Sequence, residues 1–202
     1  MFNQVASRQE LEIVAKALNE RNFKAEIVST KEAALEKLLE ILPEGAEVMT
    51  ASSTSLNEIG FTDYLATKGS KLVSLHEKIN QENDQNKRSL MRRHAVAADY
   101  FLASPNAVTK DGLIVAVDAT GSRVGAMPYA AGKLILLVGA QKITSNLEAA
   151  MQRIREYVFP LEDQRALKAY GAHSSFGKWV ILENEVNPER IKVILVEESL
   201  GF

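Results

Sequence analysis

Short apolar segments alternate with amphipathic helical segments along most of this 202-residue chain, and this alternation constrains the fold more than any other feature. Segments with the length and composition of strands are 25–28, 47–50, 72–75, 100–103, 112–117, 133–138, 179–182 and 191–196. Segments with the helical period are 11–18, 31–42, 84–98 and 147–158. Strands that alternate with helices form a mainly parallel sheet covered by helices. We therefore predict one α/β domain over residues 1–202.

The charge and the cysteine content exclude several classes of function. The chain has 24 Lys and Arg residues, 26 Asp and Glu residues and a net charge of −2, which argues against nonspecific nucleic-acid binding. It has no Cys, which excludes disulfides, iron–sulfur ligation, a Cys nucleophile and Cys-type zinc sites. The 3 His residues lack metal-ligand spacing, so no metal site is expected.

No segment has the pattern of a targeting signal or of a membrane span. Arg8, Glu10 and Glu12 interrupt the first segment, and the apolar run 134–140 is far shorter than the ~20 residues of a spanning helix. We expect a cytoplasmic protein that contacts no membrane. The sequence also lacks a Walker loop, a Gly-x-Gly-x-x-Gly motif after an early strand and a Gly-x-Ser-x-Gly elbow. No cofactor can therefore be predicted from its motifs.

A cluster of hydroxyl residues follows the strand predicted at 47–50. In open α/β sheets, ligands bind outside the carboxyl ends of the strands. Ser52, Ser53 and Thr54 stand at such an end, before a helix that begins near Ser55. Their hydroxyl and backbone N–H groups are suited to bind an anion. The alternative is that Ser53 or Ser55 only caps the helix.

A second polar stretch surrounds the strand predicted at 112–117. Asn106, Thr109 and Asp111 precede this strand, and a Gly-x-Arg-x-Gly segment with Arg123 at its centre follows it. Buried polar groups cost about 1–3 kcal/mol when unpaired, so these side chains either pair with one another or bind a ligand. Arg123 between two glycines suits a backbone that closely approaches an anion, with the guanidinium as a clamp. The alternative is a plain loop, because Asp-Gly at 111–112 is also a turn signal.

Three further features are open to both a structural and a functional interpretation. Lys142 follows the strand at 133–138, at the end where a site is expected, but a surface lysine is the alternative. The Gly/Ser-rich loop 170–177 contains His173, either a candidate acid or base or part of a plain loop. The basic segment 87–94 is either a solvated helix face or a surface that meets an anion or another subunit.

Together these segments resemble the LUD domain, the lactate utilization protein C family. The resemblance spans most of the chain and is carried by 52–60, 98–112, 121–126, 138–143, 190–202 and the helix that contains Glu148, Ala149 and Arg153. Its most specific part is the loop from Asn106 to Gly112 followed by Gly-x-Arg-x-Gly at 121–125. The family is similar in fold to sugar-phosphate isomerases and CoA transferases. The resemblance thus implies a Rossmann-like, mainly parallel sheet flanked by helices (NagB/RpiA/CoA transferase-like).

The resemblance implies a small anionic metabolite as the ligand, of carboxylate, sugar-phosphate or acyl-CoA type, and a link to lactate and organic-acid utilization. On this hypothesis Asp111 is the general acid or base, and Asn106 and Thr109 orient it. The residues predicted to bind the substrate are Ser52, Ser53, Thr54, Gly121, Arg123 and Lys142. The resemblance does not identify the substrate and does not establish catalysis.

The alternative is a non-catalytic accessory subunit that docks on an iron–sulfur oxidoreductase. Some family members belong to a multi-protein lactate oxidation system with iron–sulfur partners. Because this chain has no Cys, any redox centre would lie in a partner. Phe2, Tyr129 and Phe202 are candidate contact residues for such a partner, or for a second copy in a homodimer.

Overall fold

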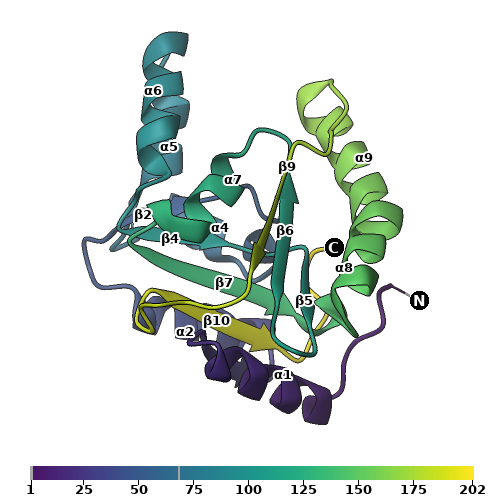
Figure 1. Cartoon of the computed structure of the whole chain (residues 1–202). Coiled ribbons are helices and arrows are strands. Elements are labelled where there is room, and N and C mark those ends of the chain that lie inside the picture. The colour runs from purple at the N-terminus through teal and green to yellow at the C-terminus, as the bar shows by residue number, and fades with distance from the viewer. Residues whose placement is uncertain (1, 68) are drawn as a thin grey trace.

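The computed structural model describes residues 2–67 and 69–202, and its centre is a six-stranded sheet (Figure 1). In order across the sheet, the strands are β1 (Lys24–Val28), β10 (Ile191–Val196), β7 (Lys133–Gly139), β4 (Tyr100–Ala103), β2 (Glu47–Thr50) and β3 (Val73–Ser74). Every neighbouring pair runs parallel. The predicted α/β architecture with a mainly parallel sheet is therefore confirmed.

A second, four-stranded sheet lies on one face of the first, and its existence was not predicted. Its strands, in order, are β8 (Ile143–Thr144), β5 (Ala107–Thr109), β6 (Ile114–Asp118) and β9 (Lys178–Leu182). Strand β6 is antiparallel to both β5 and β9. The apolar run predicted as a strand at 112–117 is β6, and its first three residues are buried because both faces of this sheet are covered.

Helices cover both sheets, and most begin at a polar cap. The helices are α1 (Arg8–Glu20), α2 (Lys31–Ile41), α3 (Thr54–Glu58), α4 (Phe61–Ala66), α5 (Leu75–Gln81), α6 (Gln85–Ala95), α7 (Ser122–Gly125), α8 (Leu147–Arg153) and α9 (Phe159–Tyr170). Wider π-helical turns occupy Ala126–Ala130 and Ile154–Val158, and a 3-10 turn occupies Ala140–Lys142. The helix predicted at 147–158 thus continues through a π-helical turn into α9. No helix in the described part of the chain is both long and apolar enough to cross a membrane.

Alternate side chains of the parallel strands build a core on each face of the sheet. One face packs against α2, α3 and α4 through Leu102, Ile135 and Leu137. The other face packs against α1, β5 and β6 through Phe101, Leu134, Leu136 and Val138. Each such buried side chain contributes about 1.5–3 kcal/mol to folding. Figure 1 shows α5 and α6 extending from this layered body at the upper left.

The outer face of the second sheet forms a third, smaller core. Val115 of β6 packs there with Ala150 of α8 and with Ile154, the first residue of the π-helical turn that follows α8. Phe202 lies against the same cluster. The second sheet is therefore held between the parallel sheet and α8, which brings the loops around β5 and β6 toward the carboxyl ends of the parallel strands.

Candidate functional site

Several chain segments meet where the central parallel strands end. Ser55 lies in α3 after β2, Ser104 directly follows β4, Lys142 lies three residues after β7, and Leu200 follows β10. The carboxyl edge of a parallel sheet is where α/β proteins bind ligands, because several loops and helix starts face one crevice. These four residues contact one another through hydrogen bonds.

Lys142 is buried at this edge, with 3% of its surface exposed. Its Nζ donates to Ser55 Oγ at 3.0 Å and to Ser104 Oγ at 2.8 Å. No carboxylate of the described residues forms a hydrogen bond with this amine, which donates to the two hydroxyls instead. Burial, reinforced by the positive charges of Arg153 and Arg123, lowers the pKa of Lys142 to about 7.

Arg123 reaches the same place from α7, on the other side of Ser104. Its Nη1 donates to the backbone oxygen of Ser104 at 2.9 Å, and its Nη2 donates to Asn106 Oδ1 at 3.0 Å and to the Val117 oxygen at 2.5 Å. Its Nε is buried and has no hydrogen-bond partner among the described residues. Burial lowers the pKa of the guanidinium, and the charge of Asp118 acts in the opposite direction. The guanidinium nevertheless stays charged at neutral pH.

The Asp118 carboxylate fixes the start of α7 and thereby the position of Arg123. It accepts the backbone N–H groups of Arg123 and Val124, at 3.0 and 3.1 Å, and that of Gly121. A carboxylate at a helix start is stabilised by these unpaired N–H groups. Gly121 therefore contributes to the site through its backbone, as the residue that precedes α7.

Arg153, the last residue of α8, is the third basic group of this region and is 1% exposed. Its Nε donates to the Phe2 oxygen at 3.1 Å, and its Nη1 donates to the Asn106 oxygen at 2.7 Å. Its Nη2 is buried and has no hydrogen-bond partner in the part of the chain that the structure describes, and the guanidinium carbon lies 5.3 Å from the centre of the Tyr157 ring. Burial lowers the pKa of this guanidinium, which also remains a cation at neutral pH.

Lys142, Arg123 and Arg153 thus form a group of basic side chains around the segment 104–106, which we call the basic cluster. None of the three forms a salt bridge with a carboxylate in the described structure. A buried cation without a charged partner is costly, because it has lost water and gained no counter-ion. An anion bound at the basic cluster would compensate that cost.

The chain segment 199–202 closes the site. The side chain of Gln141 donates to the Leu200 oxygen at 2.8 Å and accepts from the Leu200 N–H at 3.1 Å. The Gly201 N–H donates to a Glu58 carboxylate oxygen at 2.7 Å. A Cβ atom on Gly201 would lie 2.5 Å from Ser55 Oγ and 3.4 Å from Lys142 Nζ, so only a glycine fits here. Leu200 and Gly201 must move before a ligand can reach Lys142.

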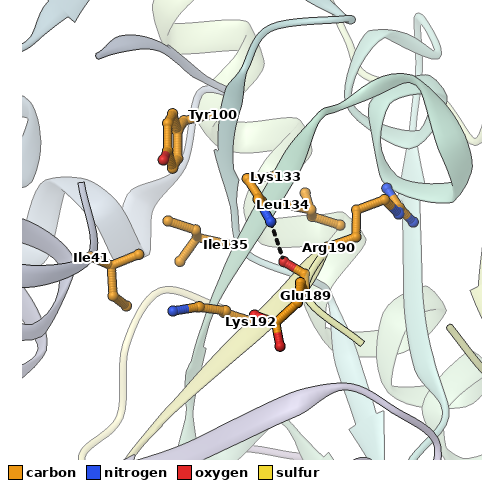
Figure 2. Close-up of a pocket in the computed structure, with 8 residues that line it drawn as sticks. All are labelled: Ile41, Tyr100, Lys133, Leu134, Ile135, Glu189, Arg190 and Lys192. Atoms are coloured by element: carbon orange, nitrogen blue, oxygen red, sulfur yellow. Dashed lines mark hydrogen bonds between the residues drawn. The ribbon is translucent and has the colours of Figure 1, made fainter. Parts of the chain in front are cut away.

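A separate hollow of about 110 Å³ lies at the opposite edge of the sheet (Figure 2). It is lined by the first residues of three strands, among them Tyr100 of β4, Lys133 of β7 and Lys192 of β10. Lys133 Nζ donates to the Glu189 backbone oxygen at 2.8 Å, so this lysine is already engaged. The hollow contains none of the residues predicted to bind a ligand.

Comparison with known proteins gives the family. The sequence profile of the LUD domain matches residues 11–196. The chain belongs to the LUD domain family. No curated protein matches the chain.

One solved structure supports this family at the level of the fold. The LUD domain is similar to the crystal structure of a DUF162 family protein from Deinococcus radiodurans, with 15% identity, 96% of this chain and 99% of that chain covered, and a TM-score of 0.56. It overlaps less well with a D-ribose-5-phosphate isomerase in complex with phospho-erythronic acid (13% identity, 85% and 95% covered, TM-score 0.37). Ribose 5 phosphate isomerase A from Neisseria gonorrhoeae gives 15% identity, 78% and 76% covered and a TM-score of 0.36.

In this LUD domain, three of the residues predicted for the site come together. Asn106 accepts from both arginines, through its side chain from Arg123 and through its backbone from Arg153. Lys142 shares Ser104 with Arg123, because one donates to its hydroxyl and the other to its carbonyl. Asn106, Arg123 and Lys142 therefore belong to one connected hydrogen-bond network.

The hydroxyl residues after β2 were interpreted either as an anion site or as a helix cap, and the structure shows both a cap and a contact with Lys142. Ser53 is the N-cap of α3 and accepts from the Leu56 N–H at 3.3 Å. Ser52 is exposed, and Thr54 is the first residue of the helix. Ser55 is the member of this cluster that bonds to Lys142. Substrate binding by Ser52, Ser53 and Thr54 remains a prediction.

Thr109 and Asp111 pair with each other in the turn between β5 and β6. Thr109 Oγ1 donates to the Asp111 carboxylate and accepts from the Leu113 N–H at 2.9 Å. The Asp111 side chain is 60% exposed, and Arg21, the C-cap of α1, donates to its backbone oxygen at 2.7 Å. No hydrogen bond of the described residues joins this turn to Arg123 or Lys142. The catalytic roles of Thr109 and Asp111 remain predictions.

Ser104 and Arg153 were not among the residues predicted for the site. The burial of Arg153 could have been predicted from the sequence, because its spacing places it on the same face of the helix as the apolar residues Ala150 and Ile154. A charged residue on an apolar helix face is rarely buried without a function or a partner. A role for Ser104 was harder to predict, because its only indication is its place as the first residue after β4, at the carboxyl edge.

The remaining polar features lie outside the basic cluster. His173 is exposed and bonds to Asp163 at 2.9 Å, which lowers the pKa of that carboxyl. Arg88 in the basic segment donates to the backbone oxygen of Glu82, the C-cap of α5. In the described residues, no group of three or more His, Cys, Asp or Glu residues is arranged to hold a metal ion.

Proposed function

We propose that this LUD domain binds a small anionic metabolite, of carboxylate, sugar-phosphate or acyl-CoA type, at the basic cluster, and that it serves lactate or other organic-acid utilization. The observation that carries the proposal is the burial of Lys142, of Arg153 and of Arg123 Nε around one segment, where none of the three side chains forms a salt bridge. The family resemblance supports the link to organic acids. The hydrogen bonds that Asn106 and Ser104 accept support anion binding, because they hold the two arginines in place.

The unpaired donors determine where the anion would bind. Arg123 Nε and Arg153 Nη2 lack acceptors in the described structure, whereas the other guanidinium nitrogens are bonded to backbone or amide oxygens. A hydrogen bond from a charged donor to an anion contributes about 1.5–3 kcal/mol, or roughly tenfold to hundredfold in affinity. Two such donors, on arginines whose charges also act on Lys142, favour a carboxylate or a phosphate over a neutral ligand.

A thermal-shift screen tests this proposal. Lactate, sugar phosphates and acyl-CoA compounds are each added to the wild-type protein, and we expect at least one of these anions to raise its unfolding temperature because it binds only the folded state. Lys142→Met removes the amine group of the basic cluster with little change in volume and should reduce the shift strongly. Arg123→Lys keeps the charge but loses the fork of donors and should also reduce it.

The matched control is Arg93→Ala, which removes an exposed arginine of α6, the helix that extends from the layered body (Figure 1). This variant should respond like the wild type. The proposal is wrong if no anion stabilises the wild type, or if Lys142→Met, folded, responds as strongly as Arg93→Ala.

A second candidate function is the non-catalytic accessory subunit. Two observations favour it: Thr109 and Asp111 satisfy each other, and the segment 199–202 fills the space above Lys142. Tyr129, a candidate contact residue, is 88% exposed, whereas Phe2 and Phe202 are half-buried. This candidate predicts that the same screen finds no stabilising anion.

A further inference from the structure

Lys142 differs from the two arginines in one chemical respect: its side chain can lose a proton near neutral pH and become a nucleophile. Burial is the largest influence on the group, and the charges of Arg153 and Arg123 act in the same direction. Glu58 acts in the opposite direction but does not bond to the amine. A pKa of about 7 means that a large fraction of Lys142 is the neutral amine at neutral pH.

The two serines set the direction of the amine's lone pair. Ser104 Oγ donates to the Leu137 oxygen at 2.6 Å, and Ser55 Oγ donates to the Leu200 oxygen at 3.1 Å. Each hydroxyl oxygen therefore accepts a bond from Nζ. A neutral amine has two N–H bonds and one lone pair, and both N–H bonds are used by the hydroxyls. The lone pair is left for an electrophile.

We propose that Lys142 forms an imine with a 2-oxo acid whose carboxylate is bound by Arg123 and Arg153, an inference that rests on the proposed function. Arg123 Nε and Arg153 Nη2 are the buried donors that lack an acceptor among the described residues, and a carboxylate supplies acceptors for them. A 2-oxo acid carries its carbonyl carbon directly beside its carboxylate. One small molecule thus matches both the unpaired donors and the amine.

The reaction is a condensation with no change of oxidation state. The Nζ lone pair attacks the carbonyl carbon, so a C–N bond forms while the C=O π bond breaks. One amine proton moves to the former carbonyl oxygen, which gives a carbinolamine. The second amine proton leaves with that hydroxyl group as water, and the C=N bond forms. The hydroxyls of Ser55 and Ser104 are in contact with Nζ and are placed to relay these protons.

Borohydride trapping tests this proposal, because borohydride reduces an imine to a stable secondary amine. The full chain is incubated with pyruvate or glyoxylate and borohydride, and the modified peptide is identified by mass spectrometry. We expect one reduced adduct per chain, located on Lys142. Lactate, which has no carbonyl group, should give no adduct. Lys142→Met should give none either, while Arg93→Ala should be trapped like the wild type.

Binding measured in parallel separates this inference from the proposed function. If pyruvate or lactate raises the unfolding temperature but no adduct appears on Lys142, the imine is refuted and anion binding stands. If adducts spread over surface lysines at the rate seen with unfolded chain, the imine is refuted as well. If neither binding nor trapping occurs with any anion, both proposals fail.

Discussion

Lys142 carries a cost that depends on pH, because its protonated form is buried without a carboxylate partner. Its pKa falls from an ordinary value of 10.5 to about 7 in the folded protein. Between these two values the unfolded chain binds more protons than the folded chain does. The contribution of Lys142 to the free energy of unfolding therefore rises as the pH increases from 7 to 10.5, and it is most unfavourable below pH 7.

Replacing Lys142 with Met should remove this pH dependence. We expect Lys142→Met to be more stable than the wild type near neutral pH, with a difference that shrinks by up to about 1.4 kcal/mol for each pH unit above that. Denaturant unfolding of both proteins at roughly pH 7 and pH 9 measures the difference. A stability difference that is equal at both pH values would show that folding does not lower the pKa of Lys142.

Sequence position alone identified some of the residues of the site. Lys142 and Asn106 could be predicted because each follows a strand of a parallel sheet at the carboxyl edge. The choice among Ser52 to Ser55 could not be made, because it depends on which residue begins α3 and a shift of one residue turns the side chain by about a quarter of a helical turn. Ser53 takes the cap, and this leaves Ser55 facing Lys142.

The segment 199–202 acts as the cover of the site, and its hold depends on a glycine. Gly201 has φ of +62°, a left-handed conformation that favours glycine, and its backbone lies directly against Ser55 and Lys142. Leu200, which is buried, bonds to Gln141 through both its N–H and its oxygen. The cover is therefore attached both by these hydrogen bonds and by apolar packing of Leu200 and Phe202 against the cores.

Gly201→Ala should loosen the cover, and Gly171→Ala is its matched control. Gly171 also has a positive φ, +68°, but a Cβ there meets nothing within 4 Å. Both variants carry the backbone cost of about 1–2 kcal/mol, and only Gly201→Ala adds a clash with Ser55. We expect faster hydrogen exchange at residues 199–202 and faster modification of Lys142 by amine reagents in Gly201→Ala alone. Equal behaviour of the two variants would contradict the assignment of this segment as the cover.

The second sheet shows why some elements could not be predicted. Strand β5 spans only Ala107–Thr109, inside a stretch whose Pro, Asn and Lys residues indicate a loop. Strand β6 was predicted, but an apolar run that is covered on both faces has the same pattern whether its neighbours are parallel or antiparallel. Pairing with β5 and β9 is decided by tertiary contacts. The parallel sheet was predicted because its strands alternate with strongly periodic helices.

At the scale of the whole molecule, the two edges of the parallel sheet differ in how their charges are balanced. At the amino edge, Lys133 and Arg190, which line the hollow in Figure 2, bond to backbone and carboxylate oxygens. At the carboxyl edge, the basic cluster has unpaired donors and no carboxylate bond in the described structure. With a net charge of −2, the molecule has no overall attraction for anions. Any anion selectivity must come from the basic cluster.

A crystal structure of the protein with the anion that binds best in the thermal-shift screen tests the central claim most directly. We predict density for that anion within hydrogen-bond distance of Arg123 Nε and Arg153 Nη2, beside Lys142, with Leu200 and Gly201 displaced from Ser55. An anion bound only elsewhere, such as at the amino edge of the sheet, with the basic cluster still covered by the segment 199–202, would contradict the account.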